Sequence, residues 1–223
     1  LRIATIGTSM ITDDFIQVAA NDQAAFVGTL SRDAERGTAF TAERGGERNF
    51  TSLDELAAAG DVDAVYIGSP NALHYEQALA CIAGGKHVIV EKPFCATEAQ
   101  RSRSFALPRQ QVSWPSGYAS PPRSRLPRHR GVLGEIAPIR RASLRFGKYS
   151  SRYNEILAGR ATNIFDAYGI GFLMDIGVYT VEPMVEIFGM PSVHQHDHAA
   201  RPSTQELTHG PIDGCGSILA SYG

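Results

Sequence analysis

Short runs of β-branched and apolar residues alternate with helical stretches throughout residues 1–90, and this alternation constrains the fold more than any other feature of the chain. Strands that are separated by single helices pair in parallel through crossover connections, which leaves helices on both faces of the sheet. The predicted strands cover residues 1–6, 24–30, 62–67 and 87–90, and the predicted helices cover residues 11–20, 33–44, 53–59 and 72–83. Ser52 and Glu55 have the spacing of a capping box at the start of the third helix. The pattern therefore predicts an α/β fold with a doubly wound parallel sheet.

The second half of the chain differs from the first in composition and in its pattern of predicted elements. Residues 101–130 hold seven arginines and five prolines but no acidic residue, which predicts either disorder or a frameshifted, misread stretch. Regular structure resumes as a predicted strand at 135–146, a helix at 171–188 and strands at 192–196 and 217–222. We therefore expect a dinucleotide-type domain at 1–118 and, at 119–223, a partial substrate-binding and oligomerisation domain. The second is an incomplete α+β domain with an open, mainly antiparallel sheet.

Composition excludes several classes of protein. A formal net charge of -2 with 20% charged residues is ordinary for a globular domain, so neither nucleic acid nor a membrane is expected as a partner. The three cysteines have no CxxC spacing, which argues against a sulfur-bound metal and favours a reducing compartment. No apolar run approaches the roughly 20 residues that span a bilayer. A cytoplasmic protein acting on small molecules is the expectation.

A turn between the first strand and the first helix could bind a phosphate. It consists of Gly7, Thr8, Ser9, Met10 and Ile11, and the helix N-terminus that follows favours an anion such as a pyrophosphate. Only the first glycine of the G-x-G-x-x-G fingerprint is kept, because Ser9 and Thr12 stand at the later positions. A plain strand-to-helix turn is the open alternative.

The second predicted strand ends in Ser31 and Arg32, where NAD-preferring folds often carry an acidic residue for the ribose 2'-hydroxyl. A guanidinium beside a hydroxyl suits the 2'-phosphate of NADP, because arginine donates bidentate, charge-assisted hydrogen bonds. The alternative is a solvated arginine beside a helix N-cap formed by Ser31 or Asp33. NADP is the predicted cofactor, with NAD as the other candidate.

Two further segments leave predicted strands at the same edge of the sheet, where ligands bind in such folds. They are Ser69, Pro70 and Asn71 with His74 in the helix that follows, and Glu91, Lys92 and Pro93. Taken alone, His74 would be interpreted as a capped surface histidine and Lys92 as a solvated lysine. Their place at the carboxyl edge leaves coenzyme contacts as the other interpretation.

The motifs together resemble the Gfo/Idh/MocA oxidoreductases, the family of glucose-fructose oxidoreductase and inositol dehydrogenase. The resemblance covers most of residues 1–99 and 131–195, and it rests on Ile6-Gly7-Thr8-Ser9, Ser31-Arg32, Ser69 to His74, Gly85 to Pro93, Gly134-Glu135-Ile136 and Asp175 to Tyr179. It implies a Rossmann domain, a nicotinamide cofactor, a cis bond between Lys92 and Pro93, and a Lys92 side chain beside the nicotinamide ring and the substrate hydroxyl.

The resemblance also implies catalytic roles for Asp175 and Tyr179. Four residues apart on the predicted helix, they share one face and can point at one substrate. A tyrosine at this position resembles the dihydrodiol and xylose dehydrogenase branch, and its phenol can act as general acid or base. The alternative is that Asp175 caps or pairs locally while Tyr179 packs in the core.

The predicted function is hydride transfer between a nicotinamide and a sugar, polyol or diol, by a homo-oligomer assembled through the sheet of the second domain. The open alternative is a catalytically silent or truncated cofactor-binding relative that acts as a sensor or scaffold. Three alternating histidines, His194, His196 and His198, imitate a metal site, but a solvent-facing strand is the better interpretation, so no metal is predicted.

Overall fold

A computed structural model shows two compact units, Leu1–Pro115 and Ser116–Gly223. The structure describes residues 1–104, 106–108, 112–113, 135, 138–147, 149, 153–158, 171–200 and 213–222. Each unit is described by itself.

The first unit is built on a six-stranded sheet in the order β3-β2-β1-β4-β5-β6, in which every pair is parallel. Its strands are β1 (Arg2–Ile6), β2 (Ala25–Leu30), β3 (Arg48–Phe50), β4 (Ala64–Ile67), β5 (His87–Val90) and β6 (Val112–Ser113). The chain runs outward from β1 to β3, returns across the sheet, and continues outward from β4 on the other side of β1. The predicted doubly wound Rossmann sheet is confirmed, with its change of direction between β1 and β4.

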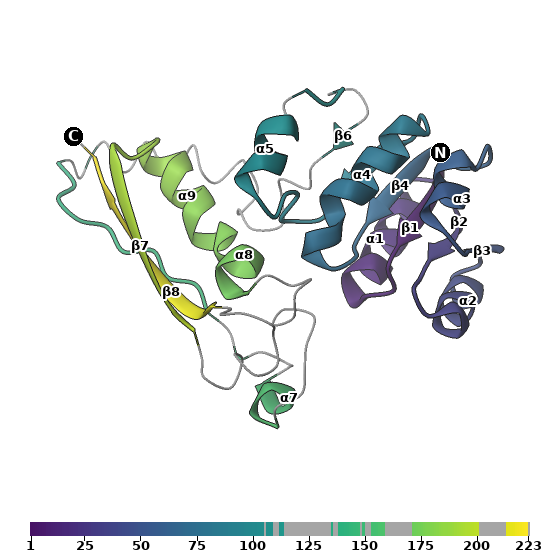
Figure 1. Cartoon of the computed structure of the whole chain (residues 1–223), viewed down its shortest axis with the longest axis horizontal. Coiled ribbons are helices and arrows are strands. Elements are labelled where there is room, and N and C mark those ends of the chain that lie inside the picture. Colours follow the sequence, from purple (N-terminus) through teal and green to yellow (C-terminus); the bar gives the residue numbers. More distant parts are fainter. Residues whose placement is uncertain are drawn as a thin grey trace. The chain divides into compact units, whose positions relative to one another are not determined.

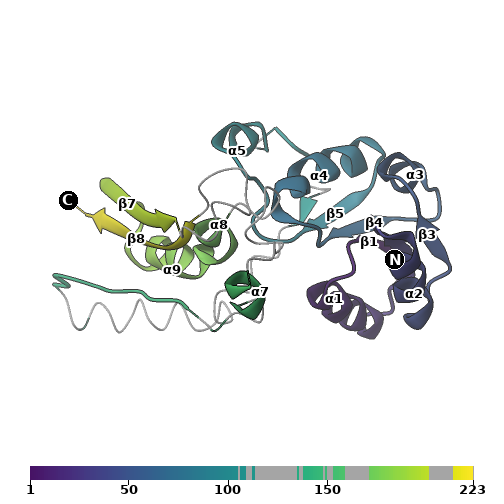
Figure 2. The same ribbon diagram turned by 60° about the horizontal axis from the view of Figure 1, so that its bottom comes forward.

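Helices cover both faces of this sheet (Figures 1 and 2), α1 and α2 on one face and α3 and α4 on the other. Their bounds are α1 (Met10–Asn21), α2 (Ala34–Glu43), α3 (Leu53–Ala58) and α4 (His74–Ala83), with a 3-10 turn η1 (Asn71–Leu73) before α4 and α5 (Glu98–Ser104) after β5. Successive residues of each strand point to opposite faces of the sheet. Ala4 and Val65 join the apolar cluster with Leu56 of α3, whereas Tyr66 stacks on Phe15 of α1.

The ends of the four central strands lie level with one another. Ile6 pairs with both Leu30 and Ile67, and Ile67 pairs with Val90. The residues that follow these strand ends therefore emerge at one edge of the sheet. This alignment brings the segments after β1, β2, β4 and β5 together.

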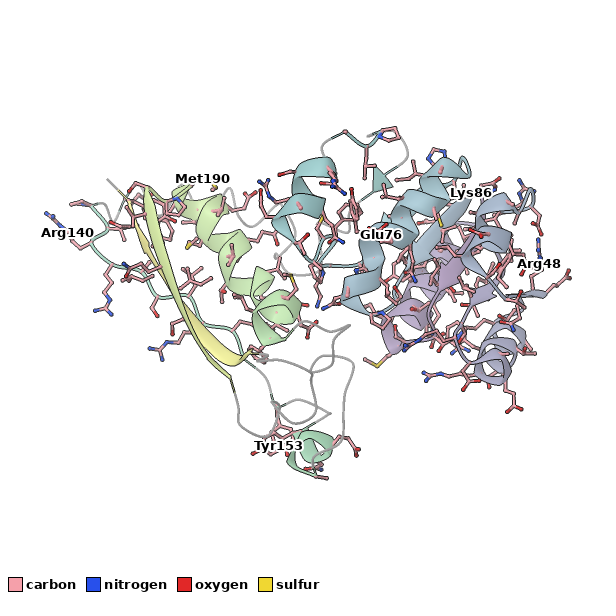
Figure 3. The ribbon with its side chains drawn as sticks, in the orientation of Figure 1. Arg48, Glu76, Lys86, Arg140, Tyr153 and Met190 are labelled. Atoms are coloured by element: carbon pink, nitrogen blue, oxygen red, sulfur yellow. The ribbon has the colours of Figure 1, made fainter. Side chains whose placement is uncertain are left out.

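The second unit contains two short helices, a longer helix and a strand pair. Their bounds are α7 (Tyr153–Leu157), α8 (Phe172–Ile176), α9 (Val178–Phe188), β7 (Val193–Ala200) and β8 (Asp213–Ser221), and the two strands pair antiparallel. Phe188 at the end of α9 contacts Tyr222 after β8, with ring centroids 5.9 Å apart. Met190 lies in the turn between α9 and β7 and is mostly exposed (Figure 3).

The structure corrects two predictions made from the sequence and adds one strand that the sequence did not predict. The helix expected at 171–188 is interrupted at Gly177, which ends α8 and precedes α9. The strand expected at 135–146 is absent from the described residues 138–146. There Ala142, Leu144 and Phe146 alternate as a strand would require, but all side chains except the half-buried Leu144 are exposed, so this apolar side is not buried. The strand β3 was not predicted, because three residues that carry Arg48 and Asn49 show no apolar alternation.

Most of the stretch at 101–130 lies outside the described residues, so its interpretation as a disordered or misread segment stays a prediction. Its described part holds the end of α5 and the short edge strand β6, which pairs with β5 through Val88 and Val112.

Candidate coenzyme-binding site

The turn after β1 requires glycine at its first position. Gly7 has φ +102°, and a Cβ there would lie 2.8 Å from the main-chain oxygen of Gly68. The Gly7 amide donates to the Leu30 carbonyl at 2.9 Å, and the buried Thr29 hydroxyl lies 3.2 Å from the Gly7 carbonyl. The turn is therefore held against the ends of both β2 and β4.

Other contacts take the place of the two missing glycines of the fingerprint. Ser9 caps α1 and its hydroxyl contacts the Thr12 hydroxyl at 3.0 Å, while Thr12 is fully buried. A Cβ on Gly68 would lie 2.6 Å from the Thr12 hydroxyl oxygen. The third glycine of the fingerprint normally lets the helix approach the strand closely. Here Gly68, at the end of β4, permits that approach, because it has no side chain to meet Thr12 of α1.

The end of β2 carries positive charge beside this turn. Asp33 caps α2 by accepting from the Arg36 amide at 3.0 Å, and the Ser31 hydroxyl accepts from the Asp33 amide at 3.3 Å. Arg32 is exposed, and Arg36 donates its guanidinium to the Thr8 carbonyl at 3.0 Å. Arg36 was not singled out in the sequence, because a first-turn helix arginine is usually solvated; its contact with Thr8 is set by the fold.

The segment after β4 is tied to α4 by two side chains. The Ser69 hydroxyl donates to Gln77 at 2.5 Å, and the Ser69 carbonyl lies 2.7 Å from Nε2 of His74. His74 is only 1% exposed. The interpretation of His74 as a surface residue is therefore wrong, because α4 begins against the sheet and covers its first residue.

The Glu91-Lys92-Pro93 segment leaves β5 at the same edge. Glu91 is buried and accepts from the Tyr66 hydroxyl at 2.6 Å and from the Lys92 amide at 3.3 Å. Lys92 is half-buried, and its bond to Pro93 is cis, as the resemblance implies. Tyr66 was missed at the sequence level because it reads as a core aromatic; its hydroxyl fixes the residue before Lys92.

The second unit holds the other two candidate residues on successive helices. Asp175 is in α8 and Tyr179 is in α9, and both are half-buried. The spacing argument assumed one continuous helix, so the shared face no longer follows from it. The Tyr179 ring packs against Phe146, with centroids 4.3 Å apart. The meeting of these two residues with Lys92 stays a prediction.

Thiol and metal chemistry find little support in the described residues. Burial raises the pKa of the Cys81 thiol to about 12, which removes its nucleophilic form. Within the described ranges, no cluster of three or more His, Cys, Asp or Glu side chains could hold a metal, and the side chains of His194, His196 and His198 are not among those described. No helix in the described part is long and apolar enough to cross a membrane.

A parallel sheet in this strand order, with a positive-φ glycine turn at its change of direction, defines a dinucleotide-binding Rossmann protein. The family comparison agrees. The Gfo/Idh/MocA family, described as an oxidoreductase family with an NAD-binding Rossmann fold, matches residues 1–112, and this chain belongs to it.

Two relatives show how far the likeness extends. The chain is 37% identical over 228 residues to scyllo-inositol 2-dehydrogenase (NADP(+)) of Bacillus subtilis, covering 100% of this chain and 66% of that enzyme. It is 29% identical over 198 residues to human trans-1,2-dihydrobenzene-1,2-diol dehydrogenase, covering 85% of this chain and 56% of that enzyme. The chain thus spans just under two thirds of the length of the first relative.

A solved structure supports the fold. The 3-ketoreductase KijD10 from Actinomadura kijaniata, solved with NADP and TDP-benzene, matches with a TM-score of 0.76 at 23% identity, covering 100% of this chain and 66% of that one.

Proposed function

We propose that this chain is the coenzyme-binding part, with a portion of the substrate-binding part, of an NADP-preferring oxidoreductase for a sugar, polyol or diol. One observation carries the proposal. The four central strands end level with one another, and the residues that follow them are Gly7, Ser31, Gly68 and Glu91. The glycine turn, the basic corner (Ser31 and Arg32) and the lysine segment (Glu91 to Pro93) therefore share one edge of one parallel sheet. Ligands of doubly wound sheets bind at that edge.

The preference for NADP rests on charge. The two residues that directly follow β2 are not acidic; Ser31 and Arg32 would bind a 2'-phosphate through a hydroxyl and a guanidinium, while Asp33 caps α2. Arg36, four residues after Arg32, holds Thr8 of the phosphate turn and would serve either coenzyme. A Cβ at Gly7 would clash with the Gly68 oxygen, so this turn keeps the tight glycine conformation that pyrophosphate-binding turns use.

Lys92, Tyr179 and Asp175 are the proposed catalytic residues. A bound nicotinamide would supply or accept the hydride in this reaction. The ammonium of Lys92 would stabilise the alkoxide that develops on the substrate oxygen, and the Tyr179 phenol would move the proton at that oxygen. Asp175 would orient the substrate or Tyr179.

The substrate class is proposed from chemistry and from the relatives. Two relatives are named as an inositol dehydrogenase and a dihydrodiol dehydrogenase. Inositols and dihydrodiols both carry secondary hydroxyl groups. A lysine and a tyrosine around one oxygen suit such hydroxyls in either direction of reaction. We propose the same class here, in a cytoplasmic homo-oligomer assembled through the sheet of the second unit.

Coenzyme titration tests the basic corner. We expect Arg32→Gln to weaken NADPH binding about 10- to 100-fold, the worth of a charge-assisted contact, and to leave NADH binding nearly unchanged. Arg36→Gln should weaken both coenzymes alike, because its contact is to the turn and not to the 2'-phosphate. Arg140→Gln, an exposed arginine of the second unit (Figure 3), is the control. Equal losses for both coenzymes in Arg32→Gln would refute the proposed preference.

A second candidate function is a catalytically silent coenzyme-binding protein that acts as a sensor or scaffold. Turnover separates the two. If NADPH binds but no inositol, sugar or diol in a panel changes the nicotinamide absorbance, the silent alternative is correct.

A further inference from the structure

Tyr66 of β4 is a buried tyrosine whose ring is held by two neighbours. The residue is 3% exposed, and its ring stacks on Phe15 of α1 with centroids 4.0 Å apart and planes 8° from parallel. The ring also lies against Gly68, where a Cβ would meet it at 3.0 Å. Because α1 and the end of β4 both hold the ring, the position of its hydroxyl is fixed as well.

The Tyr66 hydroxyl contacts the segment that follows β5. It donates to Oε1 of Glu91 at 2.6 Å, and Oε2 of the same carboxyl group accepts from the Lys92 amide at 3.3 Å. Glu91 is 7% exposed, so water does not readily replace either donor. The Glu91 amide donates to the Ile67 carbonyl at 3.0 Å. The chain is therefore held through both its main chain and a side chain at the residue before Lys92.

The loss of the Tyr66 hydroxyl would reach Lys92 through this carboxyl group. Lys92 is half-buried, so the groups bonded to its main chain contribute much of its positioning. Without the hydroxyl, a buried oxygen of Glu91 would lose its donor, which costs free energy. The carboxyl group would then turn towards another partner. Because the Lys92 amide is bonded to the same carboxyl group, that movement would displace Lys92.

We propose that Tyr66 is a positioning residue that holds Lys92 for the reaction by way of the Glu91 carboxyl group. The same ring packs on α1, the helix that begins at the phosphate turn, so one side chain connects that helix to the lysine segment. The kinetic consequence rests on the proposed function. The link from the Tyr66 hydroxyl to the Lys92 amide does not, and it can be measured without coenzyme.

Amide hydrogen exchange, followed by NMR, tests the link in the absence of coenzyme and turnover. Tyr66→Phe keeps the ring and removes the hydroxyl, and we expect it to speed exchange of the Lys92 amide about 2- to 10-fold, the effect of losing one hydrogen bond. The Lys86 amide, which donates to the Cys81 carbonyl at 2.9 Å before β5, should keep its rate. An unchanged rate at Lys92, or an equal increase at Lys86, would overturn the proposal.

Kinetics test the positioning role. We expect Tyr66→Phe to lower kcat about 10- to 100-fold, the usual effect of misplacing a reacting group by about 1 Å, with a smaller change in the KM for substrate. The matched control is Tyr75→Phe, because Tyr75 is equally buried and its ring packs edge-on against Phe94 with centroids 5.8 Å apart. Equal kcat values in the two variants would overturn the positioning role.

A double-mutant cycle separates this proposal from the proposed function. Lys92→Met should lower kcat strongly, and adding Tyr66→Phe should lower it no further, because no ammonium is left to position. A further loss in the double variant would show that Tyr66 acts on another group, which overturns the proposal. If Lys92→Met keeps the kcat of the unmodified chain, the catalytic role of Lys92 is refuted, and the positioning role falls with it.

A measurement on the unmodified chain covers the case in which Tyr66→Phe does not fold. The hydroxyl proton of Tyr66 should give its own NMR signal, because it is buried and hydrogen-bonded to Glu91. The hydroxyl proton of Tyr149, which is 75% exposed, should exchange with water too fast to be seen. Equally fast exchange at Tyr66 would contradict the proposal.

Discussion

The two units of this chain position their candidate residues by different means. In the first unit, the edge residues follow buried strands whose register fixes where each one emerges. In the second, Asp175 and Tyr179 lie on half-buried helices beside a two-stranded sheet. Every buried hydrophobic side chain among the described residues belongs to the first unit. In the first unit, the positions of the site residues can be predicted from the strands alone, because the strand register fixes the edge of the sheet. In the second unit, the positions of Asp175 and Tyr179 depend on what packs against their helices.

Truncating one aromatic side chain in each unit tests this difference most strongly. We expect Phe50→Ala to cost about 3–5 kcal/mol of unfolding free energy, because the Phe50 side chain is fully buried and a cavity remains. Phe188→Ala should cost roughly less than half of that, since Phe188 is half-buried and keeps contact with water. Urea titration followed by circular dichroism measures both. Equal losses would show that the second unit is as tightly packed as the first.

A pair of glycine substitutions tests whether the turn after β1 holds the coenzyme at the edge of the sheet. Gly7→Ala and Gly45→Ala both place a side chain at positive φ, at a cost of about 1–3 kcal/mol each. Only the Gly7 variant also pushes against the Gly68 oxygen, because Gly45 has open space around it. Thermal melts should therefore show the larger loss for Gly7→Ala, and NADPH binding should be lost in that variant alone. Intact NADPH binding by Gly7→Ala would mean that the turn does not hold the coenzyme.

The smallest expected effect concerns an ion pair at the amino edge of the same sheet. Hydrogen bonds from the Arg2 side chain and amide lower the pKa of Asp63 from its usual value. A carboxylate whose pKa is lower in the folded state stabilises the fold above its unfolded pKa, near about 4, and that stabilisation is lost as the pH falls further. Both side chains are partly exposed to solvent screening, so the effect at neutral pH should be small.

Melting temperatures across a pH series measure this ion pair. Asp63→Asn should melt slightly below the unmodified chain at neutral pH, and the difference should vanish in acid. Asp14→Asn, at an exposed position of α1, is the control. A constant difference at every pH would assign the effect to packing and not to charge.

Much of the first unit could be predicted from sequence because its signals are local. The strands at β1, β2, β4 and β5 are apolar runs that need no partner to be recognised, and their parallel order follows from the intervening helices. The three residues of β3 carry no such signal. The compensation of Thr12 by Gly68 and the contact of Arg36 with Thr8 arise between elements far apart in the chain, which no local pattern encodes.

The second unit shows where such reasoning failed. The helical spacing of apolar residues continues across Gly177 and predicts one helix. The structure has two helices instead, because α8 ends before Gly177 and α9 begins after it. His74 illustrates the same limit in the first unit. Its residue type suggested an exposed position, whereas its burial follows from the packing of α4 on the sheet.

A crystal structure with NADP and a bound polyol is the most direct test of the central claim, that Lys92 of the first unit and Tyr179 of the second act on one substrate oxygen. The account predicts the Lys92 ammonium and the Tyr179 hydroxyl within about 2.6–3.2 Å of the same oxygen, beside the nicotinamide. A bound coenzyme with either group out of reach of that oxygen would contradict it.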